Sequence, residues 1–207
     1  MLPQTEQMAM HGLINRAIQC FYRDTYGAPA WAELVRALDL DFTEFEPMLQ
    51  YDSALTYRMI DAMASALGKN REFVLEDVGT FLITNPAAEA PRRLLRFGGY
   101  TFLDFLHSLD DLPDRARLAV EDLVLPALEL REHGLNQFSL RCSGDPPGMG
   151  HVLVGVLRAM ADDYGALVFL EHAGTVHGTE VIEITLIEAA FAEGRSFELG
   201  LARAEGV

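Results

Sequence analysis

The chain has 207 residues, half of them hydrophobic, which is enough to bury a full core in one domain or in a closely joined pair, and we favour one. Acidic residues outnumber basic ones 31 to 16 and no basic run interrupts the excess, so no nucleic-acid partner is expected. No apolar stretch approaches the roughly 20 residues that cross a bilayer, and the start lacks the features of a signal peptide, so we expect a cytoplasmic protein with no membrane span.

The first half of the chain is predicted to be helical. Apolar residues recur with helical spacing from Met10 to Phe21, and Gly27 can cap the end of this helix. The same spacing predicts three more helices, at residues 29–38, 53–67 and 71–83. A loop bounded by Thr84 and Pro91 is expected to follow.

Residues 97–113, FGGYTFLDFLHSLDDLP, are predicted to form one amphipathic helix after the Gly98-Gly99 break. Its apolar face carries Phe102, Phe105, Leu106, Leu109 and Leu112. Position 113 lies four residues beyond Leu109, so Pro113 is expected on the same face. His107 precedes it by six residues, about 240° around a helix, and is expected to face solvent.

Beyond Pro126 the spacing of apolar residues changes from 3.6 to 2, which predicts strands. A hairpin is expected on either side of His133-Gly134, then a helix from about Met149, and strands at 166–170 and 180–187. The segment SFEL, residues 196–199, is a candidate for another strand. The composite is a single α+β domain over residues 1–207, with a helical part at about 1–125 and an antiparallel sheet with an inserted helix at about 126–207.

Several segments, taken in order, resemble the H-NOX family of heme NO-binding domains, the gas-sensing module of soluble guanylate cyclases and of many bacterial proteins. They are MHGLINRAIQCFYRDTYGAPAW, LEDVGTFLI, RLLRFGGYTFLDFLHSLDDL and VLVGVLRAMADDYG. The resemblance runs from about Met10 to the final strand. It implies a heme cofactor, nitric oxide sensing and signal transduction.

The resemblance places the heme-ligating histidine of the family at position 113, after a Leu-Asp-x-Leu pattern that here reads Leu109, Asp110, Asp111, Leu112. Pro113 has no lone pair for iron, because its only nitrogen lies in the amide. We therefore expect no histidine-ligated heme. Pro126 matches the proline that presses on the porphyrin in relatives, and it also suits a strand start.

The resemblance also implies a Tyr-x-Ser-x-Arg motif that holds the heme propionates. The corresponding positions are Cys142, Gly144 and Pro146, with a register uncertainty of about one residue, and none keeps the hydrogen-bonding group of the motif. Val152 occupies the position where some relatives carry a distal tyrosine. The pocket outline is thus expected to survive without its ligand and its propionate clamp.

The other candidate ligands form no known signature. His172 and His177, with Glu171 beside them, are interpreted as the polar tip of a hairpin rather than a zinc site, and His151 as a residue on the polar side of its helix. His11 remains a remote candidate for a heme ligand. The two cysteines, Cys20 and Cys142, are interpreted as small buried residues.

Three functions remain open. The first is a sensor or ligand-binding module that takes up heme or another flat, apolar ligand such as a tetrapyrrole, is not itself an enzyme, and signals to a partner enzyme in trans. The second is a heme-free interaction scaffold whose cavity is filled by Phe102, Phe105, Leu109, Leu112, Val152 and Met160. The third, an enzyme acting on a tetrapyrrole, rests on fold analogy alone.

Overall fold

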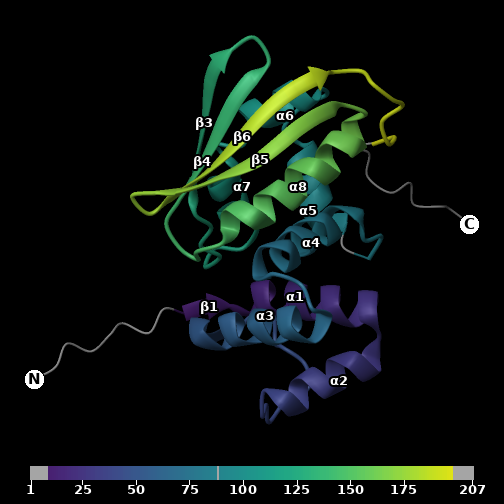
Figure 1. The fold of residues 1–207 in the computed structure, drawn as a ribbon, viewed down its shortest axis with the longest axis vertical. Helices are drawn as coiled ribbons and strands as arrows, with labels where there is room; N and C mark the ends of the chain where they lie inside the picture. The colour runs from purple at the N-terminus through teal and green to yellow at the C-terminus, as the bar shows by residue number, and fades with distance from the viewer. Residues whose placement is uncertain (1–8, 88, 198–207) are drawn as a thin grey trace, which may run out of the picture.

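The computed structural model describes residues 9–87 and 89–197, and its α+β arrangement agrees with the expectation from the sequence. Helices α1, α2 and α3 lie at one end of the molecule and a four-stranded sheet at the other, with α4, α5 and α8 between them (Figure 1). One contiguous cluster of buried side chains includes residues of both parts. None of the helices in the described part of the chain is long and apolar enough to span a membrane.

Helices α1 (Gly12–Tyr26), α2 (Ala28–Ala37) and α3 (Ser53–Leu67) begin and end at capping residues. The side chain of Asp52 accepts a hydrogen bond from the amide of Ala54 at the start of α3, and Gly68 ends this helix with a φ of 61°. Two strands absent from our prediction, β1 (Ala9–His11) and β2 (Gln50–Asp52), pair at the starts of α1 and α3. Strands of three residues are too short to show a periodic pattern.

Helices α4 (Arg71–Thr84) and α8 (Met149–Tyr164) cross at two glycines. A Cβ atom added to Gly79 would lie 2.0 Å from the carbonyl oxygen of Val152, and one added to Gly155 would lie 1.9 Å from that of Glu76. The two backbones therefore touch directly, and only glycine permits this approach. This crossing joins the helical part to the helix that covers the sheet.

The prediction of a single helix over residues 97–113 is wrong, because the chain forms two short helices in this region. Helix α6 spans Phe102–His107 and α7 spans Leu112–Ala119. A proline inside a helix clashes with the carbonyl four residues earlier, whereas it suits the first turn, where Pro113 lies. Arg115 donates to the carbonyl oxygen of Ser108 at 2.7 Å and so satisfies one acceptor at the end of α6.

Two further differences concern connecting segments. Helix α5 (Glu89–Arg96) begins within the loop expected to end at Pro91, and its acidic first turn and basic last turn suit the helix dipole. Of the candidate strand SFEL, Ser196 and Phe197 have no regular structure and the rest lies outside the described residues.

The sheet has the strand order β3-β4-β6-β5, and every neighbouring pair is antiparallel. Its strands are β3 (Ala127–Gly134), β4 (Gln137–Ser143), β5 (Leu167–Val176) and β6 (Thr179–Glu188). Tight turns with positive φ at Asn136 and at His177-Gly178 close the two hairpins. The inner face, which carries Leu140, Ile182 and Ile184, packs against α8 and is buried.

Candidate functional site

Four of the predicted pocket residues belong to the common core. Leu109, at the break between α6 and α7, is fully buried, and Leu112 is 7% exposed. Cys142 on β4 and Val152 on α8 are 2% and 8% exposed. Residues far apart in the sequence thus contribute to one buried cluster.

The two prolines lie at the starts of elements. Pro113 is half-buried in the first turn of α7, and Pro126 is buried just before β3. Because α6 ends at His107, the helical spacing no longer relates Pro113 to Leu109. His107 is exposed, as expected, and its Nε2 lies 3.3 Å from a carboxylate oxygen of Glu132.

The remaining two predicted positions lie in the turn between β4 and α8. Gly144 is exposed, with a φ of 105° and open space where a side chain would begin. Pro146 is half-buried and follows a cis peptide bond. Neither residue offers a side-chain hydrogen-bond donor, so this turn presents only backbone groups to a ligand.

The side chains predicted to fill the cavity are densely packed. Phe105, Leu109 and Met160 are each 0% exposed and Phe102 is 2% exposed. A void that admits water would expose the side chains that line it, so these residues are in contact with protein on all sides. Any flat molecule the size of a porphyrin could enter only if they moved.

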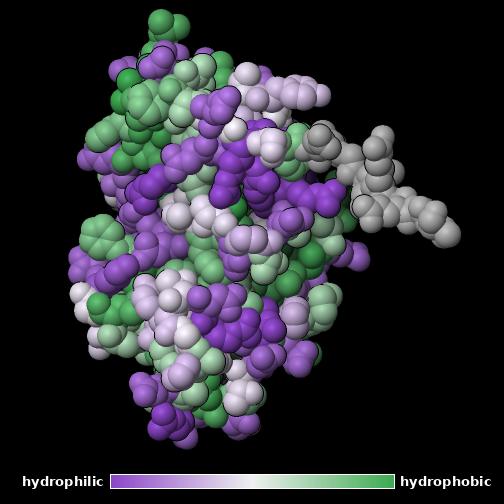
Figure 2. Space-filling view, turned by 90° about the vertical axis from the view of Figure 1, so that its right-hand side faces the viewer, coloured by the Kyte–Doolittle hydropathy of each residue, from purple (hydrophilic) through white to green (hydrophobic). Residues whose placement is uncertain are grey.

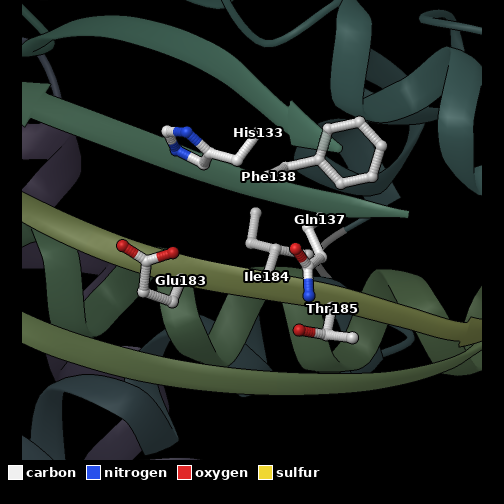
Figure 3. Close-up of a pocket in the computed structure, with 6 residues that line it drawn as sticks. All are labelled: His133, Gln137, Phe138, Glu183, Ile184 and Thr185. Carbon is white, nitrogen blue, oxygen red and sulfur yellow. The ribbon is translucent and has the colours of Figure 1, made fainter. Parts of the chain in front are cut away.

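A shallow hollow of about 330 Å³ lies elsewhere, on the outer face of the sheet (Figure 3). His133, Gln137, Glu183 and Thr185 give it a polar lining. The Nε2 of His133 is 2.7 Å from the hydroxyl of Ser139, which fixes the imidazole on this face. The polar lining does not match a flat, apolar ligand.

His11, the remote candidate for a heme ligand, is buried at the start of α1, and its role as a ligand stays a prediction. Its Nδ1 accepts a hydrogen bond from the amide of Leu13 at the start of α1, and its Nε2 lies 3.1 Å from Oδ1 of Asp122. Both ring nitrogens are engaged. The pair connects α1 to the segment between α7 and β3, and it lowers the pKa of Asp122, chiefly through the hydrogen bond.

The sequence reasoning missed one group of potential ligands. His151 of α8, His172 of β5 and Glu180 of β6 place one ligand atom each within 4.8 Å of one another. His177, which we had considered with His172, is instead exposed at the hairpin turn. Cys142 pairs with Glu180 across the sheet, and burial raises the pKa of its thiol to about 12, so it remains protonated.

Comparisons with known proteins converge on one family. A family model described as haem-NO-binding matches residues 11–172. Among curated proteins, soluble guanylate cyclase 89Da of Drosophila melanogaster is 20% identical over 158 residues, which are 76% of this chain and 24% of the relative. Soluble guanylate cyclase gcy-31 of Caenorhabditis elegans is 22% identical over 154 residues, which are 74% of this chain and 22% of the relative. The chain therefore spans about a quarter of the length of these relatives.

Solved structures give the same fold. An H-NOX protein from S. oneidensis in the Fe(II) ligation state superposes with a TM-score of 0.76 at 18% identity, over 91% of this chain and all of that chain. An Fe(II) unliganded H-NOX mutant from K. algicida gives a TM-score of 0.73 at 13% identity, over 86% of this chain and 97% of that chain.

Proposed function

Because the chain belongs to the haem-NO-binding (H-NOX) family of sensor domains, we propose that it is a signalling module of this family that works without histidine-ligated heme. The observation that carries the proposal is Pro113. It occupies the position that the sequence resemblance assigns to the iron ligand, and it lies in the first turn of a new helix. A prolyl nitrogen cannot bind iron.

The packing of the core supports the same proposal. The six side chains that would fill a former cofactor cavity are between 0 and 8% exposed: Phe102, Phe105, Leu109, Leu112, Val152 and Met160. The residues present therefore do not fit a heme, since they supply neither an axial ligand nor space. Gly144 and Pro146 likewise leave the propionates without a charged partner.

A second candidate is a ligand-binding module whose pocket opens on binding. It is favoured by three methionines in the core, Met59, Met63 and Met160, each 0% exposed. Methionine side chains are unbranched and adapt to altered packing, so a core rich in them can admit a ligand at lower cost. The ligand would be flat and apolar.

We also infer that residues 1–207 act as one domain and that the partner is a signalling enzyme. The single contiguous core supports the first inference. The second rests on the relatives, which are guanylate cyclases of about four times the matched length.

Titration with hemin tests the proposal. We expect no saturable binding to the unmodified protein and no absorption spectrum of imidazole-ligated heme. Pro113→His is expected to remain without stoichiometric heme, because the surrounding side chains still fill the space. His107→Ala is the control for adventitious binding to an exposed histidine.

Stoichiometric heme held by a protein imidazole in the unmodified chain would refute the proposal. Saturable binding without imidazole ligation, accompanied by a change in the mobility of the core methionines in NMR spectra, would favour the second candidate instead.

A further inference from the structure

The group formed by His151, His172 and Glu180 lies on the inner side of the sheet, at the first turn of α8. Three different elements contribute to it, and its ligand atoms all lie within 4.8 Å of one another. The side chains of His172 and Glu180 are 13% and 11% exposed and that of His151 is 18% exposed. The group is therefore shielded from bulk solvent but remains reachable by a small ion.

The carboxylate of Glu180 is held in place by backbone amides. Its Oε1 accepts from the amide of Gly148 at 2.8 Å, and its Oε2 accepts from that of Gly150 at 3.2 Å. A Cβ at position 150 would lie 2.6 Å from Oε2 and 2.8 Å from Nε2 of His172, so glycine is needed for this close approach. A carboxylate has about four lone-pair positions, so it can still bind a cation.

The two histidines are also oriented by neighbours. The Nδ1 of His172 accepts from the amide of Gly174 at 3.2 Å, which directs its Nε2 to Oε2 of Glu180 at 3.0 Å. The ring of His151 stacks on that of His172, with centroids 3.9 Å apart and planes 13° apart. The stacking therefore places the imidazoles of both histidines beside the carboxylate of Glu180.

An outer carboxylate completes the arrangement. Oε1 of Glu76, which Arg158 holds through its other oxygen at 2.9 Å, lies 3.7 Å from Nδ1 of His151. That nitrogen has no hydrogen-bond partner within the described residues. A carboxylate behind a ligating histidine is a usual feature of metal sites, because it directs the other ring nitrogen toward the ion.

We propose that His151, His172 and Glu180 form a binding site for a divalent transition-metal ion. Two imidazoles and one carboxylate suit Zn²⁺ and its neighbours better than Mg²⁺ or Ca²⁺, which prefer oxygen ligands alone. Three protein ligands leave one position of a tetrahedral ion for water. The bound ion would connect the β5–β6 hairpin to the start of α8.

Binding requires small changes in the group. A metal ion that binds Nε2 of His172 displaces the proton from that nitrogen. The neutral ring then carries its proton on Nδ1, by exchange through solvent, and gives up the hydrogen bond from Gly174. The stacked rings must also turn apart, because ligands of a tetrahedral ion diverge.

Calorimetric titration of the full chain with Zn²⁺ tests the site, and Co²⁺ serves as a spectroscopic probe of tetrahedral coordination. We expect one ion per chain, with weaker binding at acidic pH because protons compete with the metal for its ligands. His151→Phe keeps a flat ring but removes both nitrogens, and it should weaken binding more than tenfold. His172→Ala should have at least as large an effect. Glu76→Gln should weaken binding about 10–100-fold through loss of the outer carboxylate.

His177→Ala is the matched control, because His177 lies on the same hairpin but outside the group. It should leave the affinity unchanged. Circular dichroism should show that His151→Phe remains folded, so that a loss of binding reports on the ligands. The proposal is overturned if Zn²⁺ does not bind stoichiometrically, if His151→Phe binds as tightly as the unmodified chain, or if His177→Ala abolishes binding.

Discussion

The direct contact between α4 and α8 gives a quantitative prediction for Gly155→Ala. The new Cβ would lie 1.9 Å from the carbonyl oxygen of Glu76, about 1.5 Å short of ordinary contact. The atom that the new Cβ meets belongs to the backbone of α4, so the overlap cannot be relieved by the rotation of a side chain. We expect the overlap to cost about 3 kcal/mol, the upper end of typical overpacking, while alanine recovers about 1 kcal/mol of helix propensity.

The net loss of about 2 kcal/mol corresponds to a fall of about 4–8 °C in the thermal midpoint of a chain of this length. Thermal unfolding followed by circular dichroism measures it. Gly68→Ala is the control, because Gly68 has open space around it and is constrained only by its φ of 61°. It should cost about 1 kcal/mol, or about 2–4 °C.

The second glycine of the crossing sharpens the test. Gly79→Ala should be similarly destabilising, since its Cβ would lie 2.0 Å from the carbonyl oxygen of Val152. Once either alanine has separated the helices, the other should cost less, so the double variant should lose less stability than the two single losses combined. A Gly155→Ala protein as stable as the unmodified chain would refute the reasoning.

Two further predictions concern ionisable groups. The hydrogen bond from His11 lowers the pKa of Asp122, so its ionised form stabilises the fold above the ordinary carboxyl pKa, and this contribution is lost as the pH falls through the lowered value. The thermal midpoints of Asp122→Asn and the unmodified chain should differ at neutral pH and converge in acid, and a gap that persists in acid would contradict this cause. Burial raises the pKa of the Cys142 thiol to about 12, so a thiol reagent near pH 8 should modify the partly exposed Cys20 first, as mass spectrometry of the peptides can show. Equal rates for both cysteines in the folded protein would contradict it.

The sequence predicted those elements whose pattern is long and regular. The helix from Met149 and the hairpin of β3 with β4 were confirmed because their apolar spacing persists over a whole element. Strand β5 runs to Val176, beyond the predicted end at residue 170, and so places His172 on the strand rather than at the hairpin tip. The H-NOX resemblance was confirmed by the family model and the solved structures. The assignment of individual pocket positions stays a prediction.

The errors have local causes. The helix expected over 97–113 ignored the ring of Pro113, although the apolar spacing of Phe105, Leu109 and Leu112 continues through the break. Helix α7 was missed because this proline lies in its first turn and it buries only Leu112 and Ala116. Burial depends here on tertiary packing more than on periodicity.

The histidine group could not be found from spacing. His172 and Glu180 are brought together by the pairing of β5 with β6, and His151 joins them only through the docking of α8 on the sheet. The one signal available was Gly150 beside His151, a small residue where backbone must approach a side chain closely. A glycine of this kind points to a site only when the side chain that approaches it is known.

The surface offers fewer clues than the interior. Hydrophilic residues are spread over both the sheet-containing and the helical part of the face in Figure 2, with hydrophobic residues in smaller areas between them. Leu118 and Tyr100 are 89% and 91% exposed. Single exposed apolar side chains are common on proteins and do not define a partner surface.

The paired glycines also restrict how the molecule can move. Interlocked backbones resist sliding along each other, so we expect α4 and α8 to keep their contact at this crossing point. We then expect a rearrangement between the two ends of the molecule to occur as a rotation about this crossing point. A movement of the β5–β6 hairpin would then be expected to rotate the part that contains α1, α2 and α3, without sliding α4 along α8.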